Sequence, residues 1–195
     1  MKERPILFNS DMVRAILDGR KTQTRRIAKP QPDLLTSDGR PAWSTERGAM
    51  CQHGHTGDRL WVRETFADEG ARMCREDCYY RADGECDLQG GRWTPSIHMP
   101  RWASRITLEI TGLRVERLKD ITEQDALAEG VGQSSLWVPG PRGTLIPPEK
   151  KTLTGSHPTA RHAFSCLWES INGAGSWAQN PWVWVIEFKI VWLVF

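Results

Sequence analysis

The sequence predicts an α+β protein in which strands and flanking helices are separated by long loops. Residues 104–118 favour a strand because apolar and β-branched side chains alternate there, and residues 182–195 favour one because they are strongly apolar. Apolar residues at helical spacing over 10–18 and 160–171 favour helices. Stretches rich in Pro, Gly and charge predict long inserts at about 28–57, 67–100 and 131–156. With no visible repeat or boundary, the 195 residues are predicted to form one domain, 1–195.

The first third of the chain begins with a short strand and a helix. Pro5–Phe8 is predicted to be the strand, and Ser10 can cap a helix that runs through Asp18. Gly19 can end this helix, because glycine adopts a positive φ at little cost. Leu60–Phe66 alternates well enough to be a second strand.

Strands and helices alternate again in the second half. The strand over Ser104–Leu118 is expected to break at Gly112. Thr122 opens the next helix, with Asp125 completing a capping box. The insert at 131–156 is predicted to be a mobile loop or lid.

Two further elements close the chain. The helix over 160–171 is stopped by Asn172 and Gly173. Residues 173–181 are a turn-rich connection into the last strand.

Positive charge is concentrated near the start of the chain. The whole chain has a formal net charge of +2, which is too small to indicate a nucleic-acid partner by itself. Residues 1–32 nevertheless hold eight Lys or Arg against three acidic residues. This local excess suits an anionic ligand.

Cysteine usage and the chain start predict a cytoplasmic protein. Five cysteines, an odd number, and a start without an apolar targeting segment indicate a reducing compartment. The apolar run 182–195 is about half the length needed to cross a bilayer as a helix, and it contains Glu187 and Lys189. No membrane partner is therefore expected, and no protein partner is identified.

The run Ile16–Arg26 is the most informative segment. It places a glycine turn, an ammonium group, hydroxyls and guanidinium groups within one short stretch. Together such groups can bind a phosphate, a carboxylate or a nucleobase edge. The competing interpretation is a solvated basic turn after a surface helix.

This run resembles the G-x-K-x-x-T-x-R signature of the ASCH domain family, with Gly19, Lys21, Thr24 and Arg26 at the matching positions. The family is related to the PUA RNA-binding fold. Three later blocks resemble family segments in the family's order: Gly57–Val62, Ile121–Gly130 and Trp182–Phe188. The resemblance extends to the longer ASCH-like proteins of bacteria and prophages. It implies a PUA-like mixed β-barrel with flanking helices, and it covers the barrel rather than the inserts.

The resemblance also implies a function and a set of site residues. Some small ASCH proteins are amidohydrolases that remove the acyl group from N4-acetylcytidine, and others are proposed to bind RNA or to be ribonucleases. The family's catalytic residues match Lys21, Thr24 and Glu129. Recognition of RNA, a nucleoside or a modified cytidine is therefore expected, with hydrolysis as the alternative. A phage-associated interaction protein with a vestigial pocket is the third possibility, and no cofactor is expected.

Two chemical routes are open to these three residues. In one, Lys21, with a pKa lowered by burial and by neighbouring arginines, activates Thr24 to attack an acyl carbonyl, and Glu129 passes the proton to the leaving amine. In the other, Glu129 activates water while Lys21 and Thr24 stabilise the oxyanion. The purely structural alternative is an ion pair between Lys21 and Glu129 that ties a loop to a helix.

Three arginines near the signature are candidate ligand-binding residues. Arg25 and Arg26 are each able to pair with a phosphate. Adjacent residues of an extended segment point to opposite sides, so only one of them can face a cleft, and the family pattern selects Arg26. Arg20 supplies a further guanidinium group.

Three further ligand-binding candidates come from later in the chain. Glu64 shares a strand face with Leu60 and Val62, which predicts an inward carboxylate that either receives a cytosine amino group or forms a salt bridge. Among ten tryptophans, Trp61 and Trp102 are the first candidates for stacking on a base.

A structural zinc site is the weaker of two interpretations for the insert cysteines. Cys74, Cys78 and Cys86 offer a half-site that Cys51, His53 or His55 can complete. No second Cys-x-x-Cys is present in the sequence, so free thiols are the preferred interpretation.

Overall fold

The computed structural model describes residues 1–44, 50–68, 78–84, 92–131, 138–139, 145–146 and 159–193. The chain divides into two compact units. The first unit comprises Met1–Gly19, Cys51–Leu113 and Glu187–Phe195, and the second comprises Arg20–Met50 and Arg114–Ile186. Each unit is assembled from separate segments of the chain. The predicted single domain, 1–195, stays a prediction.

A sheet and one helix form the centre of the first unit. Strand β1 pairs in parallel with β5, and β5 pairs antiparallel with β8, which is followed by β11 in the strand order. The unit contains β1 (Glu3–Leu7), α1 (Ser10–Leu17), β5 (Arg59–Arg63), β6 (Phe66–Asp68), β7 (Cys78–Tyr80), the 3-10 turns η2 (Arg81–Asp83), η3 (Ser96–His98) and η4 (Arg101–Ala103), and parts of β8 (Ile106–Arg117) and β11 (Trp182–Leu193).

The strand faces and helix ends of the first unit follow from local sequence. Leu60 and Val62 are buried while their neighbours on β5 are half-buried, as alternation requires. Helix α1 is capped by the Asn9 side chain, which accepts from the Met12 N–H, so the predicted cap at Ser10 is one residue too late. Gly19 follows the helix with φ of 72°.

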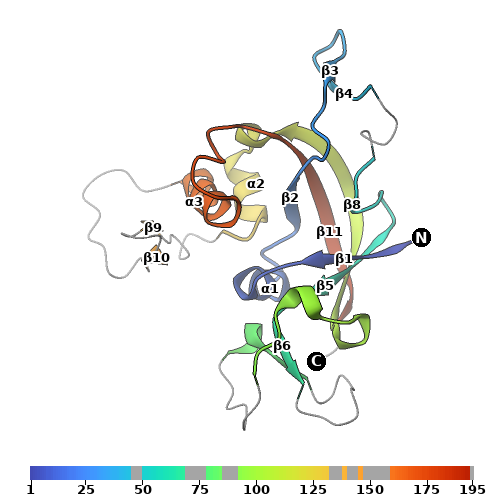
Figure 1. The fold of residues 1–195 in the computed structure, drawn as a ribbon, viewed down its shortest axis with the longest axis vertical. Coiled ribbons are helices and arrows are strands. Elements are labelled where there is room, and N and C mark those ends of the chain that lie inside the picture. Colours follow the sequence, from blue (N-terminus) through green and yellow to red (C-terminus); the bar gives the residue numbers. More distant parts are fainter. Residues whose placement is uncertain are drawn as a thin grey trace. The chain divides into compact units, whose positions relative to one another are not determined.

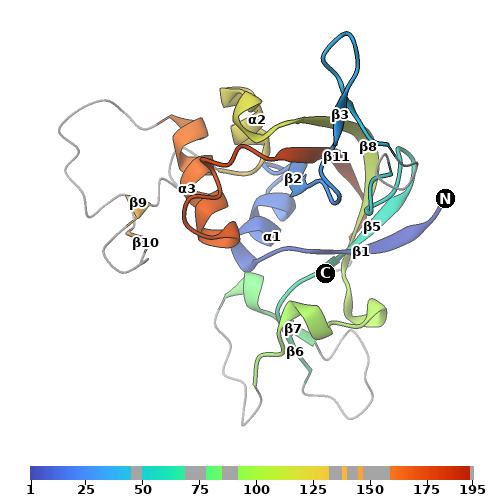
Figure 2. The same ribbon diagram turned by 45° about the horizontal axis from the view of Figure 1, so that its top comes forward.

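The second unit combines the order β8-β11-β2 with two helices. Figures 1 and 2 both show α2 and α3 side by side. Buried apolar side chains from both helices, including Phe164 and Trp168, pack with Val183 and Val185 of β11. The unit contains β2 (Gln23–Ile27), β3 (Leu34–Leu35), β4 (Pro41–Ala42), η5 (Leu118–Asp120), α2 (Glu123–Ala128), β9 (Val138–Pro139), β10 (Leu145–Ile146), α3 (Ala160–Asn172) and the remaining parts of β8 and β11.

Both helices of the second unit begin and end where the sequence predicts. Thr122 caps α2 and forms a capping box with Asp125, and Gly130 follows with φ of 89°. Thr159 caps α3, and Gly173 ends it with φ of 95°.

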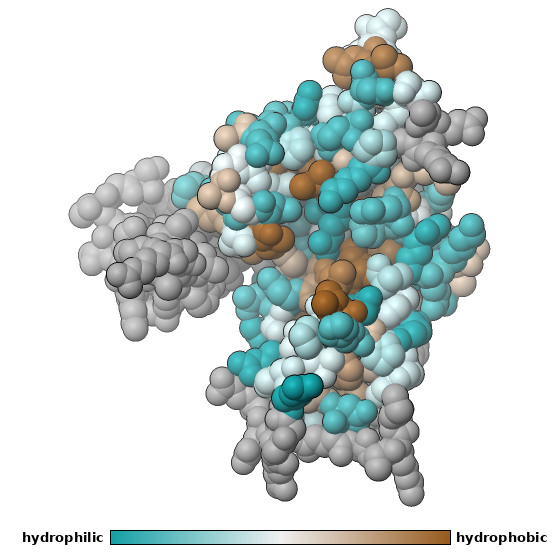
Figure 3. Space-filling view, viewed as in Figure 1, coloured by the Kyte–Doolittle hydropathy of each residue, from teal (hydrophilic) through white to brown (hydrophobic). Residues whose placement is uncertain are grey.

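The inserts contain short strands that the sequence did not reveal. β3 and β4 form a hairpin within 28–57, and Leu34 and Leu35 on it are 52% and 62% exposed. Hydrophobic atoms are visible at this hairpin in Figure 3. β6 starts at Phe66 and pairs with β7 of the 67–100 insert. The predicted strand Leu60–Phe66 is therefore divided, because β5 ends at Arg63. Most of the predicted lid at 131–156 lies outside the described residues.

The predicted α+β class is confirmed as a mixed structure with a multi-stranded sheet and few helices. In the part of the chain that the structure describes, the strands follow the order β1-β5-β8-β11-β2 and do not close into a barrel. The expected break at Gly112 is wrong, because β8 runs through it without interruption. A Cβ at Gly112 would lie 2.5 Å from the Glu187 Oε2, so the glycine makes room for a neighbouring side chain.

Candidate functional site

Lys21 and Glu129 form a buried ion pair in the second unit. Lys21 lies just before β2, Glu129 is the C-cap of α2, and the two residues form an isolated β-bridge. The Lys21 side chain is 0% exposed. Its Nζ donates to the Glu129 Oε2 at 2.8 Å, to the Glu129 carbonyl at 2.9 Å and to the Gln23 carbonyl at 2.9 Å. These acceptors match the three donors of an ammonium group.

The surroundings of Lys21 alter its basicity. Burial lowers the pKa of Lys21, and the carboxylate of Glu129 opposes this effect. The positive charges of Arg26 and Arg25 lower the pKa of Lys21 further. Its pKa therefore lies below the ordinary value for lysine, in the direction that acid–base chemistry requires.

Arg25 holds the second oxygen of Glu129. Its Nη1 donates to the Glu129 Oε1 at 3.1 Å, and its Nη2 lies 2.6 Å from the Glu116 Oε1. The Arg25 side chain is fully buried and also lies 3.6 Å from the Asp125 Oδ2. Both carboxylate oxygens of Glu129 are thus bound by cations, one by Lys21 and the other by Arg25.

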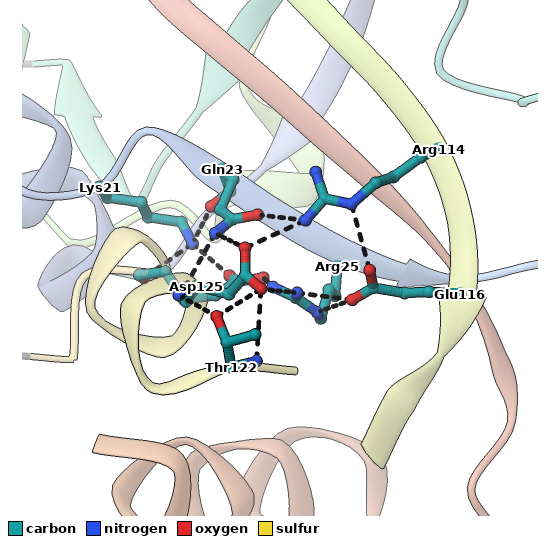
Figure 4. A network of polar contacts seen from close by, with 8 residues as sticks. Lys21, Gln23, Arg25, Arg114, Glu116, Thr122 and Asp125 are labelled. Atoms are coloured by element: carbon teal, nitrogen blue, oxygen red, sulfur yellow. Dashed lines mark hydrogen bonds and ion pairs between the residues drawn. The ribbon is translucent and has the colours of Figure 1, made fainter. Parts of the chain in front are cut away.

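A ring of polar side chains extends this arrangement (Figure 4). The Gln23 amide donates to the Asp125 Oδ1 at 2.9 Å. Arg114 donates to the same oxygen at 3.0 Å and to the Glu116 Oε2 at 3.1 Å. The set is termed the charge cluster and consists of Lys21, Gln23, Arg25, Arg114, Glu116, Asp125 and Glu129.

Asp125 is the most strongly shifted carboxyl group of the charge cluster. Partial burial acts to raise the pKa of Asp125, but hydrogen bonds from Gln23 and Thr122 and the charge of Arg25 outweigh it. The net effect lowers the pKa of Asp125 to about 2. Asp125 therefore serves both the helix cap and the charge cluster.

Four members of the charge cluster were missed as site residues by the sequence interpretation: Gln23, Arg114, Glu116 and Asp125. The available signal was periodicity, because Gln23 and Arg25 on β2, and Arg114 and Glu116 on β8, are polar residues two apart on strands. Their pairing depends on which strands and helices meet, which the sequence does not show.

Thr24 and Arg26 lie on the other side of β2 from Gln23 and Arg25, as strand alternation requires. Thr24 is buried, at 3% exposed. Among the described residues no hydrogen bond joins the Thr24 hydroxyl to Lys21 or Glu129, and a pocket shared by the three residues stays a prediction. Burial lowers the pKa of Arg26, while the charge of Glu129 raises it. Arg25 binds Glu129, and Arg26, which the family pattern selects to face a cleft, lies on the opposite side of β2.

Arg20 is exposed and lies at the edge of this region. Its Nη1 donates to the Gly130 carbonyl at 3.0 Å. The contact ties the signature loop to the end of α2, and Thr22 adds a backbone bond to the Ala128 carbonyl.

Glu64 belongs to the first unit and faces inward, as the alternation with Leu60 and Val62 predicts. Its Oε1 accepts from the Arg105 Nε at 3.0 Å, and Arg105 also binds Asp83 at 2.8 Å. Burial raises the pKa of Glu64, and the hydrogen bonds and charge of Arg105 oppose this. The geometry thus corresponds to the salt-bridge alternative.

The two tryptophans selected from the sequence are also in the first unit. Trp61 is half-buried beneath the guanidinium groups of Arg63 and Arg101. Trp102 packs against a buried apolar cluster that includes Phe66 and Met99. Trp102 therefore contributes to the core, whereas Trp61 lies on the outer face of the sheet.

Only some of the cysteines considered for a zinc site lie in the described residues. Cys78 is half-buried on β7, whereas Cys74 and Cys86 lie outside the described residues. Burial raises the pKa of the Cys51 thiol, which makes it less reactive. No group of three metal-ligating side chains occurs among the residues that the structure covers. In the same residues, no helix combines the length and apolarity that a membrane span requires.

Comparison of the chain with models of known protein families, with curated proteins and with solved structures found no match. The likeness to the ASCH family therefore remains a prediction from motifs. The charge cluster is the feature on which a functional proposal can be built.

Proposed function

We propose that this protein is an ASCH-like, PUA-related protein that binds RNA, a nucleoside or a modified cytidine next to the charge cluster. The meeting of Lys21 and Glu129, 108 residues apart in sequence, supports the proposal. Those are the signature lysine and the helix carboxylate that the family resemblance selects. Burying several charges costs more than packing apolar groups of similar size, so such a cluster is better explained by function than by stability.

The proposal is tested by ligand titration with a conservative variant. Cytidine, N4-acetylcytidine and a short single-stranded RNA are titrated by calorimetry into the wild type and Glu129→Gln. Glu129→Gln keeps the side-chain shape but removes the charge that holds Lys21 and Arg25, and we expect affinity to fall at least tenfold. Asp120→Asn is the matched control, because it removes an exposed carboxylate from the same unit. The proposal would be contradicted if the wild type bound none of the three ligands. It would also be contradicted if Glu129→Gln and Asp120→Asn bound them with equal affinity.

A second function, hydrolysis of an N4-acylcytidine, is favoured by the environment of Lys21. Its Nζ lies 2.8 Å from the Glu129 Oε2, and both side chains are buried. Since Lys21 contacts Glu129 rather than Thr24, the geometry favours the water route. Glu129 would take a proton from water, the resulting hydroxide would add to the acyl carbonyl, and Lys21 would stabilise the oxyanion. Collapse would release the carboxylic acid and return the proton to the cytidine amine.

The hydrolase alternative is tested by following N4-acetylcytidine by chromatography. Wild type, Glu129→Gln, Thr24→Val and Lys21→Ala are compared after circular dichroism has established that each is folded. We expect wild-type turnover to be lost in Glu129→Gln and retained in Thr24→Val. Loss in both would favour the threonine route, and no wild-type turnover would reject the hydrolase.

A further inference from the structure

The outer face of β5 in the first unit carries an unusual set of side chains. Arg59, Trp61 and Arg63 alternate with the buried Leu60 and Val62, so they share the outward side of the strand. Arg101 from η4 joins them. These four residues are termed the Arg–Trp face and consist of Arg59, Trp61, Arg63 and Arg101.

Trp61 contacts the guanidinium groups of Arg63 and Arg101. The Arg63 and Arg101 Cζ atoms lie 5.5 Å and 5.9 Å from its ring centroid, within the range of cation–π contacts. Arg101 also donates to the Glu3 carboxylate at 3.2 Å, and Arg63 donates to the Ile97 carbonyl. Held in this way, the cations lose little conformational freedom when they bind a ligand.

Arg59 is a cation whose neighbouring carboxylates are already engaged. In the strand register it lies opposite Glu3 on β1 and Glu109 on β8. Glu3 binds Arg101, and Glu109 binds Lys189 at 3.2 Å. In the described part of the chain the Nε–H groups of Arg59 and Arg63 are buried without an acceptor. Among the described residues the half-buried Arg59 makes no ion pair, so its guanidinium group can bind a phosphate.

The charge balance of the region favours a polyanion. Four cationic side chains meet two carboxylates here: Arg59, Arg63, Arg101 and Lys189 against Glu3 and Glu109. The exposed Leu7 and Ile97 border the face, and Trp61 lies at its centre. Guanidinium groups bind phosphate, and planar guanidinium and indole groups stack on bases.

We propose that the Arg–Trp face binds the backbone and bases of a single-stranded nucleic acid. The inference rests on the proposed function for its ligand class, but it uses residues of the other unit.

The test is fluorescence anisotropy with a fluorescein-labelled 12-nucleotide oligouridylate over a series of KCl concentrations. Arg59→Gln should weaken binding several-fold and reduce the slope of log K against log salt by about 0.7, the effect of one lost phosphate contact on a single strand. Trp61→Leu should weaken binding several-fold, with a smaller effect on the slope, because it removes the ring that orients the Arg63 and Arg101 guanidinium groups. Arg14→Gln is the matched control, since Arg14 is a half-exposed arginine of the same unit that contacts Asp11. It should bind like the wild type.

Each outcome separates this inference from the proposed function. Oligonucleotide binding that depends on Arg59, together with no Glu129-dependent binding of RNA or nucleosides, would support the Arg–Trp face and reject the proposed site. Nucleoside binding that depends on Glu129, together with equal oligonucleotide affinities for Arg59→Gln and Arg14→Gln, would overturn the Arg–Trp face alone. Equally tight, Arg59-dependent binding of polyglutamate would also overturn it, by identifying an acidic-peptide surface.

Discussion

Among single residues, Lys21 has the most demanding environment, because its ammonium group is fully buried against one carboxylate and two carbonyl oxygens. Lys21→Met should lower the free energy of unfolding by about 3–5 kcal/mol, since it leaves Glu129 buried with one of its two cations removed. Urea denaturation followed by tryptophan fluorescence measures the change.

Two further variants identify the cause of that loss. Lys21→Met/Glu129→Gln should be less destabilised than Lys21→Met, because the buried carboxylate is then neutral. Lys29→Met, at an exposed position, should change stability little. A Lys21→Met protein as stable as Lys29→Met would show that the buried pair contributes nothing to folding.

The lowered pKa of Asp125 predicts that the free energy of unfolding falls at acidic pH. Its pKa in the folded chain, about 2, lies below the ordinary value of 3.8. The stabilisation from its ionised form is therefore complete above about pH 4 and disappears as the pH falls toward 2. Because the carboxyl is partly exposed, the effect should be about 1 kcal/mol. The difference in unfolding free energy between wild type and Asp125→Asn, measured with urea, should shrink over that interval. A difference that is constant from pH 5 to pH 2 would contradict the assignment.

Among the elements, β8 differs most from the prediction, since it continues through Gly112 without a break. Gly112→Val should destabilise the protein by no more than about 1 kcal/mol, because the new side chain displaces the carboxylate end of the flexible Glu187 side chain rather than backbone. Thr111→Val, at the exposed neighbouring position, is the control. Removal of the obstructing group in Gly112→Val/Glu187→Ala should restore part of the loss in urea denaturation. No rescue would show that the glycine is required for the backbone itself.

At the scale of the whole molecule, the two units share β8 and β11, which run through both. Opening one end of a strand removes hydrogen bonds that support the other end, so we expect a single cooperative unfolding transition. Far-ultraviolet circular dichroism and tryptophan fluorescence should give the same midpoint in urea. Gly112→Val and Lys21→Met, one from each unit, should both shift that whole transition. Two separate midpoints, each shifted by one variant only, would contradict a shared transition.

Local rules account for the elements that the sequence predicted correctly. Thr122 with Asp125 marks the start of α2, and Gly173 marks the end of α3, because capping depends on residues a few positions apart. Glu64 was expected on the buried side of its strand for the same reason. The short hairpin of β3 and β4 was missed because two-residue strands carry no readable period.

The sequence by itself determined where the helices and the longest strands lie and which strand residues share a face. Its motifs also selected Lys21 and Glu129 as residues of one site. Only the tertiary structure decided which charges meet. Lys21 forms a β-bridge with Glu129, and Arg25, four residues later, lies on the same side of the extended segment. Arg25 rather than Arg26 therefore binds the Glu129 carboxylate. Glu116, 91 residues from Arg25, enters through the placement of β8. Local propensity acts over a few residues, whereas ion-pair partners are chosen by packing between distant segments, and that choice is invisible until the chain folds.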